Sequence, residues 1–189
     1  MPVEISRFTE VAAKKREASM FQIGELVVYG GEGVCRVESI GVPAIAGMDK
    51  QRQYYTLQPL YRSGQVLTPV DTKVLMRPIM TAEAARAFIA ALPDLPPQAP
   101  PEGGMRVARE HYHAVCATYD CAAMAAMVKH TARRRQWALR HGKKVSQLDE
   151  RFTRRAEDQL YGELAAALSL ARDDMETYIR QSYPAWPTE

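Results

Sequence analysis

The residues with the clearest chemical potential are arginines and lysines concentrated in the second half of the chain. Twelve basic and seven acidic residues lie between Met105 and Leu170, against seven and six between Met20 and Leu92. The basic residues are densest in one run: Lys129, Arg133, Arg134, Arg135, Arg140, Lys143, Lys144, Arg151, Arg154 and Arg155. Such a run attracts a polyanion, because its side chains pair with phosphates and release counterions. A solvated helix face would explain the same residues, so the run alone leaves both interpretations open.

A second group of reactive residue types consists of His111, His113, Cys116 and Cys121. On a helix His113 and Cys116 would share a face, but His111 would point elsewhere and Cys121 would follow a helix start at Asp120. No zinc-binding pattern fits this spacing. The glycines between Gly30 and Gly33 also lack the Gly-Lys-Ser/Thr ending of a phosphate loop. We therefore expect no catalytic residue, no metal, no cofactor and no enzymatic activity.

The compartment can also be predicted from composition. No apolar run approaches the roughly 18 residues that a transmembrane helix needs. Residues 1–19 mix acidic and basic side chains and lack the apolar stretch of a signal peptide. Three cysteines without Cys-x-x-Cys spacing predict reduced thiols. We expect a cytoplasmic protein that makes no membrane contact.

The elements that must position the basic residues fall on either side of a proline-rich segment. Residues 93–104 contain five prolines in twelve positions, which predicts a stiff linker. Before it, five short runs rich in β-branched and aromatic residues predict a small antiparallel β-barrel: Leu26–Tyr29, Val34–Glu38, Tyr54–Leu57, Gln65–Thr68 and Lys73–Met76. A helix capped by Thr81 and ending near Leu92 completes this module.

The chain after the linker is predicted to be entirely helical. One helix spans about Met105 to Thr118, and a second begins after an Asp120 cap and continues towards Leu139. The third begins after Ser146 and carries one apolar stripe, formed by Leu148, Phe152, Ala156, Leu160, Leu164 and Leu168. The predicted fold class is therefore α+β: a small barrel followed by a bundle of three or four helices.

Three segments resemble a known family. Met20-Phe-Gln-Ile-Gly-Glu-Leu-Val-Val-Tyr29, followed by Gly33, is similar to the opening strand of the CarD/CdnL family of bacterial RNA polymerase-binding transcription regulators. Residues 145–149 and 156–165 resemble the last helix of that family. Residues 124–129, with Arg133 and Arg134, resemble the helix before it. The similarity extends from about Met20 to Leu170.

The resemblance implies a fold and two partners. In the family a Tudor-like β module docks on the β subunit of RNA polymerase, and a helical module contacts promoter DNA at the upstream edge of the melted bubble. The expected result is a more stable open complex. The regulator itself is expected to be a monomer. The implied domains are an N-terminal extension (1–19), a polymerase-binding module with its terminal helix (20–92), the linker (93–104), a DNA-contacting domain (105–170) and a tail (171–189).

Candidate binding residues follow from the same resemblance and from residue chemistry. For polymerase, an exposed strand edge offers directed backbone hydrogen bonds, and the candidates are Arg36, Arg52, Gln65, Val66, Leu67 and Thr68. For DNA, positions suited to phosphate contact or to an apolar wedge are Met105, Arg106, Arg109, Lys129, Arg133, Arg134, Lys143 and Lys144.

The chain departs from the family pattern at three places. Family members often have Arg where Leu67 stands and Trp where Met105 stands. Trp137 lies in a basic segment, residues 135–144, which common members lack. Packing, a capping contact and a nucleic-acid contact all remain open for Trp137.

Two other functions are compatible with the sequence. The chain could be an adaptor whose helices bind another protein, and its binding would then depend little on salt. It could also be a small enzyme built on the His–Cys group, which stoichiometric zinc would support.

Overall fold

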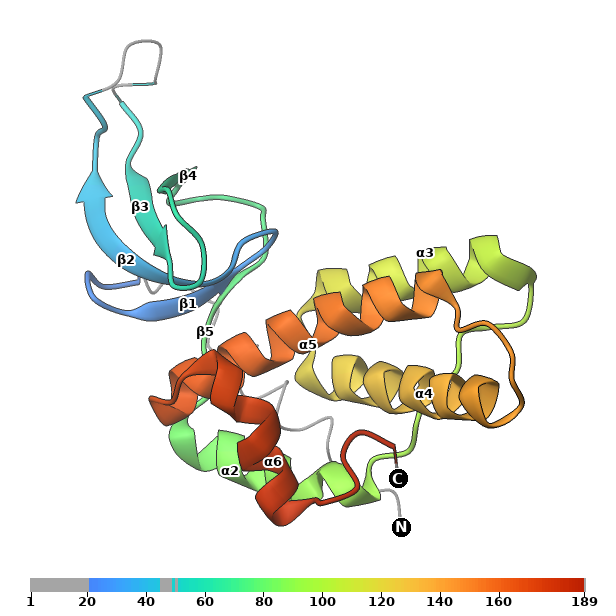
Figure 1. Ribbon diagram of the computed structural model, residues 1–189. Coiled ribbons are helices and arrows are strands. Elements are labelled where there is room, and N and C mark those ends of the chain that lie inside the picture. Colours follow the sequence, from blue (N-terminus) through green and yellow to red (C-terminus); the bar gives the residue numbers. More distant parts are fainter. Residues whose placement is uncertain (1–20, 45–48, 50, 189) are drawn as a thin grey trace. The chain divides into compact units, whose positions relative to one another are not determined.

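The structure is a computed structural model of the 189-residue chain, and it describes residues 21–44, 49 and 51–188. The chain divides into two compact units, the first ending at Ile79 and the second beginning at Met80 (Figure 1). The first contains a five-stranded antiparallel sheet and the second is helical, so the predicted α+β class is confirmed. The predicted N-terminal extension, residues 1–19, lies outside the described residues.

The sheet of the first unit is open. Its order is β4-β3-β2-β1-β5, with every neighbouring pair antiparallel. β4 and β5 are therefore edge strands, and no pairing between them closes a barrel among the described residues. The strands are β1 (Leu26–Tyr29), β2 (Gly33–Gly41), β3 (Tyr54–Pro59), β4 (Val66–Pro69) and β5 (Met76–Pro78).

Alternation along these strands builds the core of the first unit. Side chains on a strand point to opposite faces in turn, so every second residue can be buried. The resulting cluster consists of Val27, Tyr29, Cys35, Val37, Tyr55 and Leu57. The tight turn between β1 and β2 uses Gly31 and Gly33, whose positive φ angles of 94° and 83° would strain other residues.

Four of the five predicted strands coincide with observed ones, and the fifth begins later. The prediction placed it at Lys73–Met76, whereas β5 begins at Met76, opposite Tyr29. The carbonyl of Leu75 accepts a hydrogen bond from Gly30 N at 2.8 Å, so the segment before Met76 closes a loop. A short run of β-forming residues cannot reveal where the partner strand ends.

The helical unit is organised around α5. This helix packs against α2, α3, α4 and α6 (Figure 1). Phe152, Ala156, Leu160 and Leu164 of the predicted stripe are buried, whereas its end residues Leu148 and Leu168 are partly exposed. The helices are α2 (Ala82–Ala91), α3 (Gly104–Thr118), α4 (Cys121–Arg140), α5 (Gln147–Leu168) and α6 (Met175–Ser182), with 3-10 turns at Leu92–Asp94 and Arg172–Asp174.

The three predicted N-caps are confirmed. Thr81 Oγ1 accepts a hydrogen bond from Ala84 N, and Ser146 Oγ accepts one from Asp149 N. Asp120 Oδ1 accepts from two amides at the start of α4, those of Ala122 and Ala123. These side chains satisfy backbone donors that the first turn of a helix leaves free.

The division between the units lies earlier in the chain than the proline-rich segment. The sequence placed residues 82–92 with the sheet, but α2 packs on α5 and α6. Residues 93–104 also belong to the helical unit: Leu95 is buried, and Gln98 N donates to the carbonyl of Ala126 in α4. Apolar residues on α2 and after it favour burial against the helices. The proline-rich segment is therefore packed against the helical unit and is not a free linker.

The segment after residue 170 is part of the same core. Trp186 is fully buried, and its Nε1 donates to Tyr161 Oη in α5. Met175 and Ile179 of α6 are buried as well. Because a buried indole and its satisfied N–H fix a segment firmly, residues 171–188 are a structural element of the helical unit.

Candidate protein-binding and nucleic-acid-binding surfaces

The first candidate surface is the free edge of the sheet at β4. Within the described part of the chain this strand pairs with β3 alone, in the register Leu57 with Val66, Thr56 with Leu67 and Tyr55 with Thr68. Its other side presents backbone donors and acceptors that a further strand could pair with. The sequence predicted a strand at Gln65–Thr68; the structure has one at Val66–Pro69, and the strand order places it at an edge of the sheet.

The register also assigns each β4 side chain to a face. Val66 packs against the core cluster, and the buried Thr68 hydroxyl accepts a hydrogen bond from Tyr29 Oη at 3.0 Å. Leu67 lies on the opposite, outward face with Thr56, because residues paired across two strands share a face. Of the three candidates within β4, Leu67 is the one whose side chain lies on the outward face.

The same outward face continues across β3 to β2. Arg36 is exposed and pairs with Gln58, two residues from Thr56. Alternation therefore puts Arg36, Gln58, Thr56 and Leu67 on one side of the sheet. We call these four residues the outer face. Thr56 and Gln58 were not predicted from the sequence, because only the register shows which β3 residues lie on the same face as Arg36.

Arg52 already has a partner within the first unit. Its Nε and Nη2 atoms donate to the two carboxylate oxygens of Asp71 at 2.8 and 2.7 Å. This two-point contact raises the pKa of Arg52 and lowers the pKa of Asp71. A polymerase contact by Arg52 would have to compete with Asp71.

The second candidate surface lies at one end of the helical unit. Short connections make α3, α4 and α5 antiparallel, so the start of α3, the end of α4 and the start of α5 meet there (Figure 1). We call this region the basic end, and its exposed basic residues are Arg106, Arg109, Arg140, Lys143, Lys144 and Arg151. Met105 begins α3 at the same end and is 70% exposed.

Several of these cations have no carboxylate partner. Among the residues that the structure describes, Arg109, Arg140 and Lys144 form no ion pair, and Lys143 contacts only an aromatic ring. Arg106 lies 3.7 Å from Glu110 on its own helix. Cations without an internal partner lose no ion pair when they meet a phosphate, so the basic end suits a polyanion.

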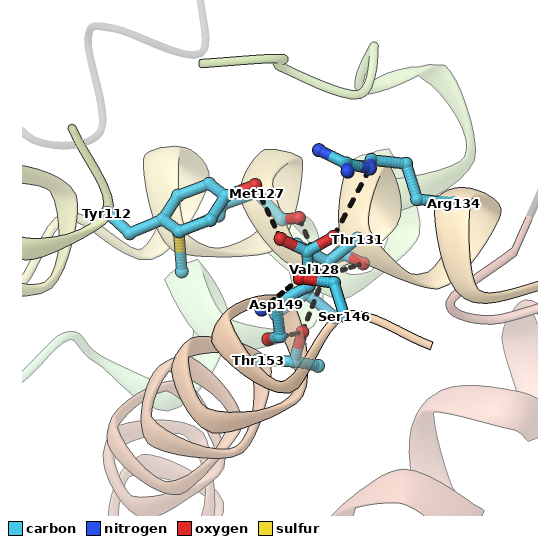
Figure 2. Close-up of polar contacts among 8 residues, drawn as sticks. All are labelled: Tyr112, Met127, Val128, Thr131, Arg134, Ser146, Asp149 and Thr153. Atoms are coloured by element: carbon cyan, nitrogen blue, oxygen red, sulfur yellow. Dashed lines mark hydrogen bonds and ion pairs between the residues drawn. The ribbon is translucent and has the colours of Figure 1, made fainter. Parts of the chain in front are cut away.

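A buried polar network holds the three helix ends of the basic end together (Figure 2). Asp149, at the start of α5, is buried and accepts a hydrogen bond from Tyr112 Oη of α3 at 3.3 Å. Its other oxygen lies 3.2 Å from Arg134 Nε of α4. Burial and the charge of Asp149 raise the pKa of Tyr112 to about 12, so its hydroxyl keeps the proton that it donates.

The network continues between α4 and α5 through hydroxyl groups. Thr153 Oγ1 donates to the carbonyl of Asp149 at 2.8 Å and lies 2.6 Å from Thr131 Oγ1 (Figure 2). Thr131 in turn bonds the carbonyls of Met127 and Val128 within its own helix. Satisfied buried hydrogen bonds of this kind fix one arrangement of the helices that carry the basic residues.

Three predicted DNA-contacting residues have structural partners. Lys129 is 1% exposed, and its Nζ donates to the carbonyls of Leu92, Pro93 and Leu95. Arg133 Nε donates to the carbonyl of Thr188, and Arg134 neutralises Asp149. Lys129 therefore has no access to a phosphate, whereas Arg133 and Arg134 are exposed but engaged.

The His–Cys group does not form a metal centre in the described part of the chain. No group of three His, Cys, Asp or Glu side chains there is arranged to hold a metal ion. Cys116 and Cys121 are buried and form no disulfide with a described cysteine, and Cys121 Sγ donates to Glu163 Oε2 at 3.4 Å. In addition, none of the described helices has the length and apolar character needed to cross a membrane.

Comparison with known sequences assigns the first unit. The sequence model of the CarD-like/TRCF RID domain matches residues 21–80, about a third of the chain. The match supports a protein that interacts with RNA polymerase and takes part in transcription. Residues 21–80 are therefore similar to a CarD-like domain. No curated protein matches the chain.

Proposed function

We propose that this chain is a transcription regulator that binds the β subunit of RNA polymerase through its sheet and promoter DNA through its helical unit. The polymerase contact uses the free edge of β4 and the outer face. The DNA contact uses the basic end. The protein stabilises the open promoter complex, because a ligand that binds melted promoter better than closed promoter shifts the equilibrium towards melting.

The observation that carries the DNA-binding proposal is the group of unpaired cations at the basic end. Residues 133–155 contain nine basic residues against two acidic ones, Asp149 and Glu150. Both acids are close to arginines of α4, Arg134 at 3.2 Å and Arg135 at 3.9 Å. The remaining positive charge faces solvent on helices that the Asp149 network holds in register.

Salt dependence tests this proposal. Each lysine or arginine that neutralises a duplex phosphate contributes a slope of about −0.9 to log K against log salt concentration. Combining Arg140→Ala, Lys143→Ala and Lys144→Ala should therefore reduce the steepness of the slope by about 2 to 3. The measurement is fluorescence anisotropy of labelled promoter DNA with the full chain at four or five salt concentrations.

The control combines Lys73→Ala and Arg86→Ala, which remove exposed cations on other elements, the segment before β5 and α2. These substitutions should leave the slope unchanged. A wild-type affinity that hardly depends on salt would instead support the adaptor function. If the salt slope changed equally in the triple variant and in the control, DNA binding would depend on net charge rather than on the basic end.

A further inference from the structure

The two tryptophans of the chain have opposite environments. Trp186 is fully buried, whereas Trp137, in the last turn of α4, is 50% exposed at the basic end. Single exposed apolar residues are ordinary on protein surfaces. Trp137 differs from such residues because an imidazole and an ammonium group contact its ring and further basic side chains surround it. These are groups that also bind nucleotides.

Two exposed side chains contact the Trp137 ring. The imidazole of His141 is stacked with it, with centroids 4.5 Å apart and planes at 27°. Lys143 Nζ lies 4.5 Å from the ring centroid. Both residues are exposed at the end of α4 and in the connection that follows, so a ligand can reach these two contacts.

A nucleobase would compete successfully for this ring. An exposed cation–π contact contributes about 0.5–1 kcal/mol. Stacking of a base on an aromatic side chain contributes about 1–3 kcal/mol. A base that displaces Lys143 from the ring also leaves the ammonium group beside the phosphate of the same nucleotide. The exchange therefore adds an ion pair while it replaces the weaker contact.

Trp137 and Lys143 line a groove of about 740 Å³ with Lys144 and Arg154. This volume lies within the roughly 300–1,000 Å³ of small-ligand sites, so it can admit a nucleotide. The wall has six basic and four acidic residues. Three of the acids have arginine partners, Asp149 with Arg134, Glu150 with Arg135 and Glu176 with Arg180, and the fourth is Glu157. The net charge that the groove presents is positive.

We propose that Trp137 and Lys143 form a stacking site for an unpaired nucleobase, so that the basic end prefers DNA with melted or flipped-out bases to intact duplex. Bases within a duplex are covered by their neighbours, and only an unpaired base offers a free ring face. This inference rests on the proposed DNA binding and deepens it, because it names the form of DNA that the site selects.

The test compares forked with blunt duplexes of the same sequence, using the full chain. Trp137→Ala should weaken binding to forked DNA by about 5- to 100-fold, the equivalent of one lost stacking contact. Binding to blunt duplex should change less than about 2-fold. Trp137→Phe should restore part of the preference. The matched control is Leu139→Ala, which removes a side chain that is 55% exposed on the same helix but has no aromatic ring.

Tryptophan fluorescence gives an independent readout. Oligothymidylate should quench the emission of the wild-type chain, and Trp137→Phe, which leaves only the buried Trp186, should abolish that quenching. Equal losses on forked and blunt DNA, or quenching that persists in Trp137→Phe, would overturn the stacking site while leaving duplex binding intact. If the wild-type chain binds no DNA in a salt-dependent way, the proposed function fails as well.

Discussion

Lys129 shows how the environment of a residue decides its role. Its position within a basic run predicted a phosphate contact, but its ammonium group is buried against three carbonyls that follow α2. Burial lowers the pKa of Lys129, and the carbonyls provide the hydrogen bonds that a buried cation requires. One lysine thus fixes the proline-rich segment to α4. Sequence periodicity could not show this, because the segment that it contacts has no repeating pattern.

Replacing Lys129 should therefore affect stability rather than DNA binding. Lys129→Met keeps most of the aliphatic stem and leaves the carbonyls without a donor, at a cost of about 2–3 kcal/mol in the free energy of unfolding. Urea denaturation measures this change. Lys144→Met, at an exposed position, should behave in the opposite way, with unchanged stability and weaker DNA binding. If Lys129→Met alters the salt slope of DNA binding without loss of stability, the structural role is wrong.

Glu157 makes the stability of the helical unit depend on pH. Burial first, and then the charges of Glu176 and Asp158, raise the pKa of Glu157 from 4.5 to about 7. Between these values the folded chain binds more protons than the unfolded chain. The contribution of Glu157 to the free energy of unfolding is therefore present below about pH 4.5 and is lost as the pH rises towards 7.

Glu157→Gln should remove this dependence. The variant should be more stable than the wild type at pH 8 by on the order of 2 kcal/mol and equally stable at pH 4. Thermal or urea unfolding across pH 4 to 8 measures the difference. Glu102→Gln, at an exposed site, is the control and should leave the profile unchanged. If the free energy of unfolding rose by the same amount between pH 5 and 7 in the wild type and in Glu157→Gln, this assignment would be contradicted.

At the scale of elements, β4 is the edge strand on which we propose the polymerase-binding surface. Composition and turn residues were sufficient to predict β4 and the helix caps, because these depend on neighbouring residues. The start of β5 and the membership of the outer face depend on pairing between distant strands, which local sequence does not encode. Thr56 and Gln58 became candidates only through the register.

A charge on the outer face should disturb polymerase binding. Leu67→Glu adds a carboxylate to the edge strand without entering the core cluster, and it should weaken the affinity for RNA polymerase by about 10-fold. Val42→Glu is the control, because Val42 is an exposed apolar residue of the same unit and lies beyond the end of β2. Biolayer interferometry with immobilised polymerase measures both variants. Equal affinities for Leu67→Glu and Val42→Glu would exclude the outer face from the interface.

At the scale of the whole molecule, the protein consists of two units with different chemistry. The sheet unit carries the CarD-like/TRCF RID domain, and the helical unit carries the basic end. The sequence predicted both kinds of unit from the change in pattern. It placed the division near the prolines, because proline content predicts stiffness but does not show whether a stiff segment is packed or free. The resemblance of residues 145–165 to the family's last helix remains a prediction.

The central claim is that one chain binds polymerase with its sheet and DNA with its helices, and so bridges them. Its most direct test is the lifetime of open promoter complexes after competitor DNA is added. The wild-type chain should prolong this lifetime, and Leu67→Glu and the combined Arg140→Ala, Lys143→Ala and Lys144→Ala variant should each fail to do so. An equal mixture of the two variants should fail as well, because neither protein can hold both partners. Restoration of the wild-type lifetime by that mixture would contradict a bridge formed within one chain.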